Sequence, residues 1–317
     1  MRKLQVLVLL ILGTSYTINA QYTETLNSNR PGESQGAFAV GTGVYQLEAG
    51  GFYGNDKHAL YKTNTDIYGA DYSLRVGVLT DILELNFMGS YQAETTTLRV
   101  GGFDEEYKRS NFPTTVIGAK ALLYDPYKNA EDKPNLYSWK ANQRFKWKKL
   151  IPAISVYGGA NLNFWDNPYT PEGEGSISPK AAIITQNNWG RWVLVLNFIA
   201  DKFTEEYSTY QGIATLTHAV TPRFAVFGEF QTIISDLYAD DLARAGMAYL
   251  LTKNLQVDVS GLVNFKDTPE RWQVAGGLSY RLDFHEEQEY SGEATQSEKR
   301  RRSRSEKRGF FRRKNKN

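Results

Sequence analysis

Alternation of apolar and polar residues is the main pattern along this chain. In the stretch 68–78, Tyr, Ala, Tyr, Leu and Val occupy every second position, and Gly, Asp, Ser, Arg and Gly lie between them. The stretch 83–91 repeats the pattern after only four residues. A period of two is typical of a β-strand whose two faces meet different surroundings. These residues therefore predict an antiparallel hairpin with one apolar and one polar face.

Twelve segments are predicted as strands. They are residues 44–53, 68–78, 83–91, 114–124, 153–165, 177–187, 191–201, 210–219, 223–231, 243–251, 255–265 and 271–284. We expect loops near 55–64 and 93–113. The turns at 80–81, 188–190, 221–222 and 252–254 are short, and the connections between them are mostly longer, as in outer-membrane barrels. We predict an all-β fold, a transmembrane antiparallel up-and-down β-barrel of about twelve strands with its N- and C-termini in the periplasm.

The start of the chain separates a membrane barrel from a soluble sandwich. Residues 1–3 are basic at two positions, residues 4–12 are apolar, and residues 18–20 resemble a cleavage site. This pattern predicts a signal peptide over residues 1–20 that is removed on export to the cell outer membrane. No later run of apolar residues is long enough for a transmembrane helix. The sequence contains no Cys, which excludes disulfides. We assign 21–43 to a periplasmic or plug segment, 44–284 to the barrel and 285–317 to a basic, disordered periplasmic tail.

Charged residues on the predicted inner faces are candidates for lining the lumen. Arg75 lies on a strand between those of Glu48 and Glu84, and Arg244 has the same relation to Glu229 and Asp258. Such residues can form a structural network that fills a narrow barrel, or a constriction that selects charged or polar solutes. Arg30, followed by the turn formers Pro31 and Gly32, can enter the lumen and complete a plug. The full set is Arg30, Glu48, Asp71, Arg75, Glu84, Lys120, Glu229, Arg244, Asp258 and Arg281.

Two basic segments are candidates for binding lipid headgroups or a partner. The long predicted periplasmic connection 125–150 and the tail 291–317, which carries eleven Lys or Arg and three Glu, both concentrate positive charge. The candidate residues are Arg144, Lys146, Lys148, Lys149, Arg300, Arg301, Arg302, Arg304, Arg312 and Arg313. In the periplasm these residues can meet outer-membrane lipid, the cell wall or a periplasmic or outer-membrane protein, whereas nucleic acid is excluded by export.

Catalytic chemistry has little support. The three histidines, His58, His218 and His285, are far apart in the sequence and have no metal-ligand spacing. His218 is the best candidate for a base, but its neighbours include no nucleophile elbow, and we expect it in the aromatic girdle at the periplasmic interface. The sequence therefore predicts no enzyme, no metal site and no cofactor.

Several motifs carry a family resemblance. They are the stretches 28–32 (Ser-Asn-Arg-Pro-Gly), 43–48 (Gly-Val-Tyr-Gln-Leu-Glu), 74–85 and the closing residues Gly277, Ser279, Tyr280 and Arg281. Together they resemble the outer-membrane transporter family labelled for the meta-pathway of phenol degradation, over residues 28–284. Asn29 replaces the Asp that is usual in that family.

The resemblance implies an outer-membrane barrel but no defined chemistry. We hypothesise a passive outer-membrane channel or transporter for small, hydrophobic or weakly polar molecules. The alternative is a non-transporting structural or accessory barrel that docks partners of an outer-membrane assembly through its basic insert and tail.

Overall fold

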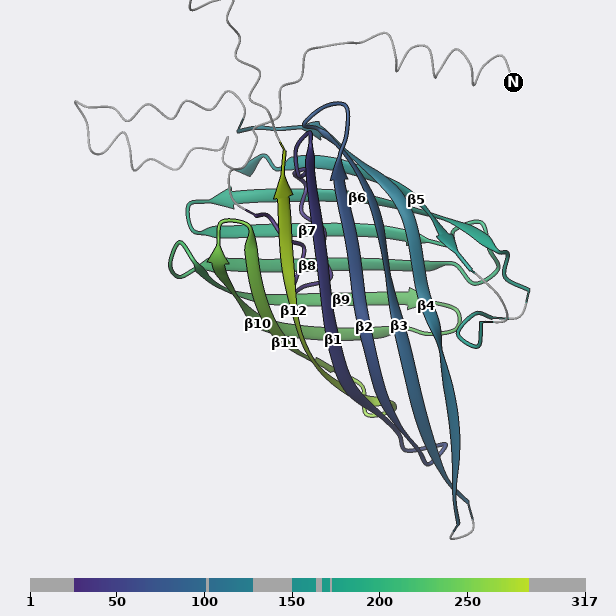
Figure 1. The fold of residues 1–317 in the computed structure, drawn as a ribbon. Coiled ribbons are helices and arrows are strands. Elements are labelled where there is room, and N and C mark those ends of the chain that lie inside the picture. Colours follow the sequence, from purple (N-terminus) through teal and green to yellow (C-terminus); the bar gives the residue numbers. More distant parts are fainter. Residues whose placement is uncertain (1–25, 101–102, 128–149, 164–166, 172, 285–317) are drawn as a thin grey trace, which may run out of the picture. The chain divides into compact units, whose positions relative to one another are not determined.

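The computed structural model forms a closed antiparallel barrel (Figure 1). It describes residues 26–100, 103–127, 150–163, 167–171 and 173–284, all within the compact unit that ends at Phe284. The barrel has twelve strands: β1 (Val44–His58), β2 (Thr63–Gly77), β3 (Leu83–Val100), β4 (Phe103–Tyr124), β5 (Ala153–Leu162), β6 (Ile177–Trp189), β7 (Trp192–Asp201), β8 (Thr209–Ala219), β9 (Phe224–Ser235), β10 (Asp240–Thr252), β11 (Leu255–Asn264) and β12 (Glu270–Asp283).

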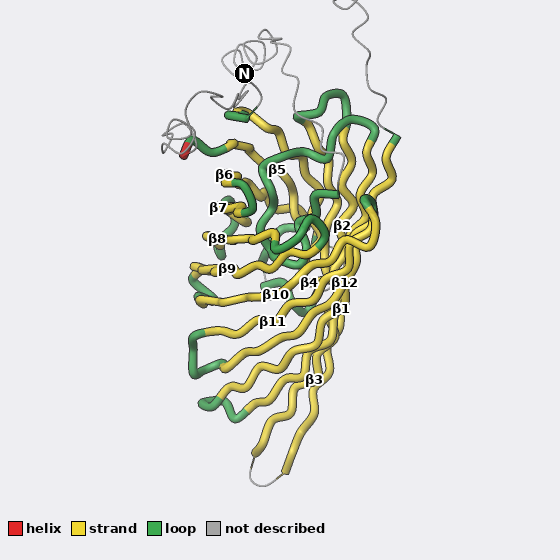
Figure 2. Tube along the Cα trace, turned by 90° about the vertical axis from the view of Figure 1, so that its left-hand side faces the viewer, coloured by secondary structure: helices red, strands yellow, loops and turns green. Residues whose placement is uncertain are grey.

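Every strand pairs with its neighbours in the chain, and β12 pairs with β1 to close the ring. The predicted antiparallel β-barrel and its strand count are therefore confirmed, whereas the periplasmic location of the termini stays a prediction. Figure 2 shows loops gathered at the two rims and inside the barrel. We call the rim where β1 begins and β12 ends the proximal rim, and the opposite one the distal rim. No helix among the residues that the structure describes is long and apolar enough to cross a membrane.

The first four strands are longer than the sequence predicted. The expected loops at 55–64 and 93–113 are mostly strand, because β1 continues to His58, β2 begins at Thr63, and β3 and β4 pair out to Val100 and Phe103. A tilted strand of about ten residues spans a membrane. The 22-residue β4 must therefore extend past it, where polar side chains are at no disadvantage. Those polar residues resembled a loop in the sequence.

The outer face of the barrel is apolar and carries aromatic residues near two levels. Tyr53 contacts Tyr68 and Trp272, with ring centroids 4.9 and 5.5 Å apart, and nearer the proximal rim Tyr45 contacts Phe284 at 6.1 Å. Between these levels, apolar side chains such as Leu47 are about half exposed. The stretch from Tyr45 to Tyr53 contains nine residues, which is about the length of a membrane-spanning strand. The outer face therefore matches a hydrocarbon layer bounded by aromatic girdles.

The inner face combines many polar residues with one small apolar cluster. The buried members of that cluster are Ala37, Val116, Leu122, Ala153, Tyr157, Ile184 and Val195. Six of them come from β4–β7, whereas Ala37 precedes the first strand and is fully buried. The chain ahead of β1 is therefore part of the barrel interior.

A tight turn at the proximal rim leads from the interior into β1. Gly41 and Gly43 have φ values of 91° and 77°, which favour glycine, and the N–H of Gly43 donates to the carbonyl of Gly77 at 3.3 Å. A Cβ at Gly77 would lie 1.6 Å from the carbonyl oxygen of Gly41. Gly77 is therefore required for the close approach of the entering chain to the end of β2.

Gly77→Ala should destabilise the barrel by about 2 kcal/mol, the usual cost of forcing extra atoms into a packed site, because the new methyl group displaces backbone rather than a flexible side chain. Urea unfolding in detergent micelles measures this change. Gly158→Ala is the control, because a Cβ at Gly158 meets nothing within 4 Å. Equal stability of the two variants would contradict the required close approach.

Candidate functional site: a lumen occupied by the N-terminal segment

The segment 26–42, here called the plug segment, is held inside the barrel by side chains of the wall. The amide of Asn197 binds both backbone groups of Gln35, accepting from its N–H at 2.7 Å and donating to its carbonyl at 3.0 Å. The N–H of Ala37 donates to Gln186 Oε1 at 2.9 Å, and Ser155 Oγ donates to the carbonyl of Ala37 at 2.5 Å. Irregular backbone inside a barrel needs such partners, because it forms no ladder of its own.

Four buried charges form a cluster near the proximal rim. The Arg75 guanidinium donates to both oxygens of Glu84 at 2.9 Å and to Glu48 Oε1 at 3.3 Å, and Lys120 Nζ lies 3.3 Å from Glu84. Each of these side chains is at most 2% exposed. Two cations and two carboxylates balance, which is how buried charges are tolerated. We call Glu48, Arg75, Glu84 and Lys120 the proximal charge cluster.

The proximal charge cluster also binds the plug segment. Arg75 Nη1 donates to the carbonyl of Asn27 at 2.8 Å, and Lys120 Nζ donates to the carbonyls of Gly36 and Phe38 at 2.9 and 3.1 Å. The N–H of Val40 donates to Glu84 Oε2 at 3.1 Å. Residues on three adjacent strands, β2, β3 and β4, thus fix the plug segment at several points along its length.

A second group of contacts holds the turn at Glu33. Glu229 accepts from the N–H groups of Glu33 and Ser34 at 3.1 to 3.3 Å, and from Thr215 Oγ1 at 2.7 Å. Arg244 pairs with Glu229 and, at 3.3 Å, with Glu33. The predicted Glu229–Arg244 pair is present, but Asp258 is not its third member. Asp258 pairs with Arg30 instead.

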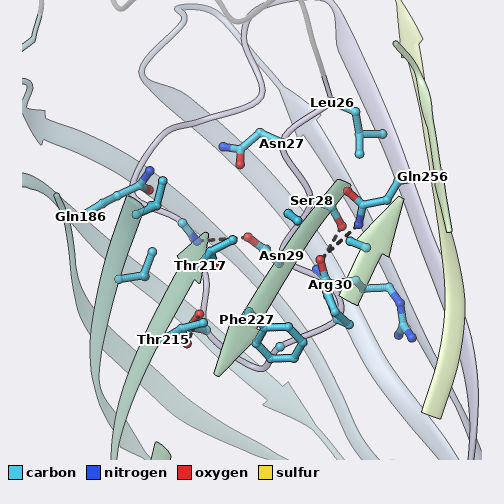
Figure 3. Close-up of a pocket in the computed structure, with 18 of the residues that line it drawn as sticks. Leu26, Asn27, Ser28, Asn29, Arg30, Gln186, Thr215, Thr217, Phe227 and Gln256 are labelled. Carbon is cyan, nitrogen blue, oxygen red and sulfur yellow. Dashed lines mark hydrogen bonds between the residues drawn. The ribbon is translucent and has the colours of Figure 1, made fainter. Parts of the chain in front are cut away.

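Arg30 lies with its side chain against the barrel wall. Its Nε and Nη2 donate to the two oxygens of Asp258 at 3.3 and 3.2 Å, and its Nη1 lies 3.9 Å from Asp71. Gln256 Nε2 donates to the Arg30 carbonyl at 3.2 Å (Figure 3). The hydroxyl oxygens of Ser28 and Ser279 are 2.7 Å apart. Asp258 was placed with the wrong partner because Arg30 lies 228 residues away in a segment without periodicity.

The remaining candidate residues lie either in the barrel wall or in segments beyond the described residues. Arg281 is 2% exposed, and its Nη2 lies 3.3 Å from Asp283. His218 packs on Trp192 with ring centroids 4.1 Å apart. The basic candidates Arg144, Lys146, Lys148 and Lys149 and those of the tail lie outside the described residues, as do the predicted signal peptide and the C-terminal tail. No cluster of potential metal ligands occurs among the residues that the structure describes.

Two cavities lie against the plug segment. One, of about 220 Å³, is lined by residues 26–32 and by wall residues that include Val193, Val195 and Phe227 (Figure 3). The other, of about 370 Å³, is lined by Glu33 and Gln35 and by Asp71, Ser73 and Ser90 among others. Asn29, Arg30 and Gly32 line both cavities. The plug segment is therefore the partition between them.

A third cavity, of about 200 Å³, lies on the inner face of the extended strands and was not predicted. It contains two ion pairs, Asp56 with Arg271 and Glu94 with Arg109 at 2.5 Å in each case. Tyr169 lies under the Arg109 guanidinium at 4.7 Å, and burial raises the pKa of its phenol to about 12. Glu94 and Arg109 were missed because 93–113 was expected to form a loop, and Asp56 was missed because 55–64 was expected to form another. In the stretch 93–113 polar residues occupy both faces of the strands, so the alternation that marks a strand is absent there.

Solved structures with similar folds are outer-membrane barrels. The COG4313 outer membrane channel from Pseudomonas putida F1 aligns over 80% of this chain and 100% of its own, with a TM-score of 0.54 and 11% identity. The transport unit of the autotransporter AIDA-I from Escherichia coli aligns over 80% of this chain and 92% of its own, with a TM-score of 0.45 and 11% identity. The first alignment shows a shared fold.

Sequence comparison extends this to a family. No curated protein sequence matches the chain. The family model described as "Putative MetA-pathway of phenol degradation" matches residues 28–282, which includes most of the plug segment and nearly all of the barrel. The match covers well over half of the chain, and its limits lie within three residues of those expected from the motifs. The chain belongs to the family described as "Putative MetA-pathway of phenol degradation".

Proposed function

We propose that the protein is a passive outer-membrane channel for small, weakly polar molecules, and that displacement of the plug segment opens it. The observation that supports this proposal is that the plug segment separates two cavities of the lumen. Asn29, Arg30 and Gly32 line the cavities on both of its sides, so displacing them joins the two cavities into one larger space. Export places the N-terminus in the periplasm, which would make the proximal rim the periplasmic one.

The plug segment is suited to leave the lumen without unfolding the wall. Its contacts are hydrogen bonds to wall side chains, which contribute about 1 kcal/mol net with neutral partners and about 1.5 to 3 kcal/mol with charged ones such as Lys120 and Glu229, because water can replace them. The wall carries its own ladder of strand pairs all the way around. The proximal charge cluster also keeps its internal pairs, Arg75 with Glu84 and Lys120 with Glu84, when the plug segment departs.

The two cavities favour a solute with both polar and apolar parts. The larger cavity presents hydroxyl, amide and carboxylate groups, such as Ser90, Gln211 and Asp201. The smaller one has an apolar wall that includes Val195 and Phe227. Their volumes, about 220 and 370 Å³, suit a small molecule. A weakly polar solute can make favourable contacts in both.

A disulfide between plug segment and wall should close the channel reversibly. The hydroxyl oxygens of Ser28 and Ser279 are 2.7 Å apart, so Ser28→Cys with Ser279→Cys places two thiols in contact, and the chain has no other Cys. In planar bilayers we expect the oxidised double variant to be silent and the reduced form to conduct, because only the reduced plug segment can leave.

Wild type and Ser279→Cys alone are the controls, and neither should respond to the reductant. Equal conductance of the oxidised and reduced double variant would show that the plug segment is not the gate. Silence of every form, including wild type, would favour the alternative suggested by the closed lumen, a non-transporting accessory barrel.

The proximal charge cluster should contribute strongly to stability. Glu84→Gln leaves Arg75 and Lys120 buried with one carboxylate between them, and removing one member of a buried ion pair typically costs about 3 to 5 kcal/mol. We expect a loss of about that size in urea unfolding in micelles, together with faster proteolysis of the plug segment.

The control is Arg99→Gln, which breaks the exposed Arg99–Asp104 pair, whose side chains are 74% and 52% exposed. This change should have no measurable effect, because exposed pairs contribute little. A Glu84→Gln barrel as stable as Arg99→Gln would mean that the cluster is not a stabilising element.

A further inference from the structure

Four residues form one row across four neighbouring strands of the wall. In the strand register, Asp258 of β11 pairs with Gly277 of β12, Gly277 pairs with Gly50 of β1, and Gly50 pairs with Asp71 of β2. Directly paired residues across a sheet point their side chains to the same face. Two carboxylates on the lumen side are therefore separated by a gap, two strands wide, that has no side chains.

The gap is filled by the guanidinium of Arg30. A Cβ at Gly50 would lie 2.2 to 2.6 Å from the guanidinium atoms, and a Cβ at Gly277 would lie 2.4 Å from Nη2. Asp258 accepts two hydrogen bonds at one end of the group, and Asp71 lies 3.9 Å away at the other. We call Asp71, Gly50, Gly277 and Asp258 the guanidinium slot. It is shaped for a flat cation lying against the backbone.

The slot depends on the plug segment for its neutralising charge. Among the ion pairs of the described ranges, Asp71 and Asp258 have Arg30 as their partner, whereas Glu229 pairs with Arg244 of the wall and Glu84 with Arg75. When Arg30 leaves with the plug segment, the wall keeps two carboxylates without their cation. A pair of exposed carboxylates beside a flat surface attracts a hydrogen-bonding cation.

We propose that the guanidinium slot is a binding site for a guanidinium or primary ammonium group of the solute, and that Arg30 occupies it when the lumen is closed. Arg30 is then an internal competitor. A solute that carries such a group takes the place of Arg30 and favours the displaced plug segment. The role in transport rests on the proposed channel function and replaces its weakly polar solute by a small molecule that carries one cationic group, whereas the slot itself is defined by wall residues.

Chemical rescue of the full-length mature protein tests the slot. Arg30→Ala should unfold at a lower temperature than wild type in micelles, and millimolar methylguanidinium should raise that temperature again by occupying the slot. Wild type, whose slot is filled, should respond much less. Tetramethylammonium at the same concentration is the control for ionic strength, because it has the charge but no N–H donor.

Two further variants test the residues of the slot. Adding Asp258→Asn to Arg30→Ala should weaken methylguanidinium binding about tenfold or more in calorimetric titration, because the bidentate carboxylate is lost. Adding Gly50→Ala to Arg30→Ala should do the same by filling the gap, because the atoms nearest to a Cβ at Gly50 all belong to Arg30, whereas adding Gly158→Ala should not weaken binding. If Arg30→Ala does not refold, Arg30→Gln retains a polar side chain and carries the same expectations.

The outcomes separate the slot from the channel. No binding of methylguanidinium to the Arg30 variants, or equal binding when Asp258→Asn or Gly50→Ala is added, would overturn the slot even if the barrel conducts. Binding by a barrel that never conducts would support the slot and reject the channel function. Binding that is lost with Asp258→Asn and with Gly50→Ala, in a barrel that conducts, would support both.

Discussion

The structure depends on one constraint, that polar groups enclosed by the barrel need partners there. The plug segment has no strand ladder, so the wall supplies partners through side chains such as Asn197, Gln186 and Lys120. The wall in turn places carboxylates in its interior that need cations. Glu84 is an example, because it contacts Arg75 and Lys120 of the wall and the N–H of Val40 of the plug segment at the same time. The plug segment and the wall thus supply each other with hydrogen-bond and charge partners.

The wall depends on the plug segment for charge balance at some places around the barrel and not at others. Glu84 and Glu229 have cations of the wall beside them, so their charge is balanced whether or not the lumen is filled. Asp71 and Asp258 have Arg30, which belongs to the plug segment. Displacing that segment therefore changes the charge balance of the wall mainly at Asp71 and Asp258, because Arg244 loses Glu33 but keeps Glu229.

The sequence predicted the wall well and the plug segment only in part. Period-two alternation located all twelve strands, and the strand order alone placed Arg75 between Glu48 and Glu84. The sequence could not predict that Asp258 pairs with Arg30. The plug segment has no hydrophobic periodicity from which its position against the strands could be extrapolated. The extensions of β3 and β4 were missed for another reason. Past the membrane both faces of a strand can be polar, so the contrast that marks a strand disappears.

The row of Asp258, Gly277, Gly50 and Asp71 shows what a glycine in a strand can mean. Glycine weakens a strand and often marks close approach by another group. Here two paired glycines lie between two carboxylates, and the approaching group is a guanidinium. Separating that cation from both carboxylates costs free energy, which holds the lumen closed. A solute that brings its own cation to the row lowers this cost, so the same contacts that close the barrel can make its opening selective.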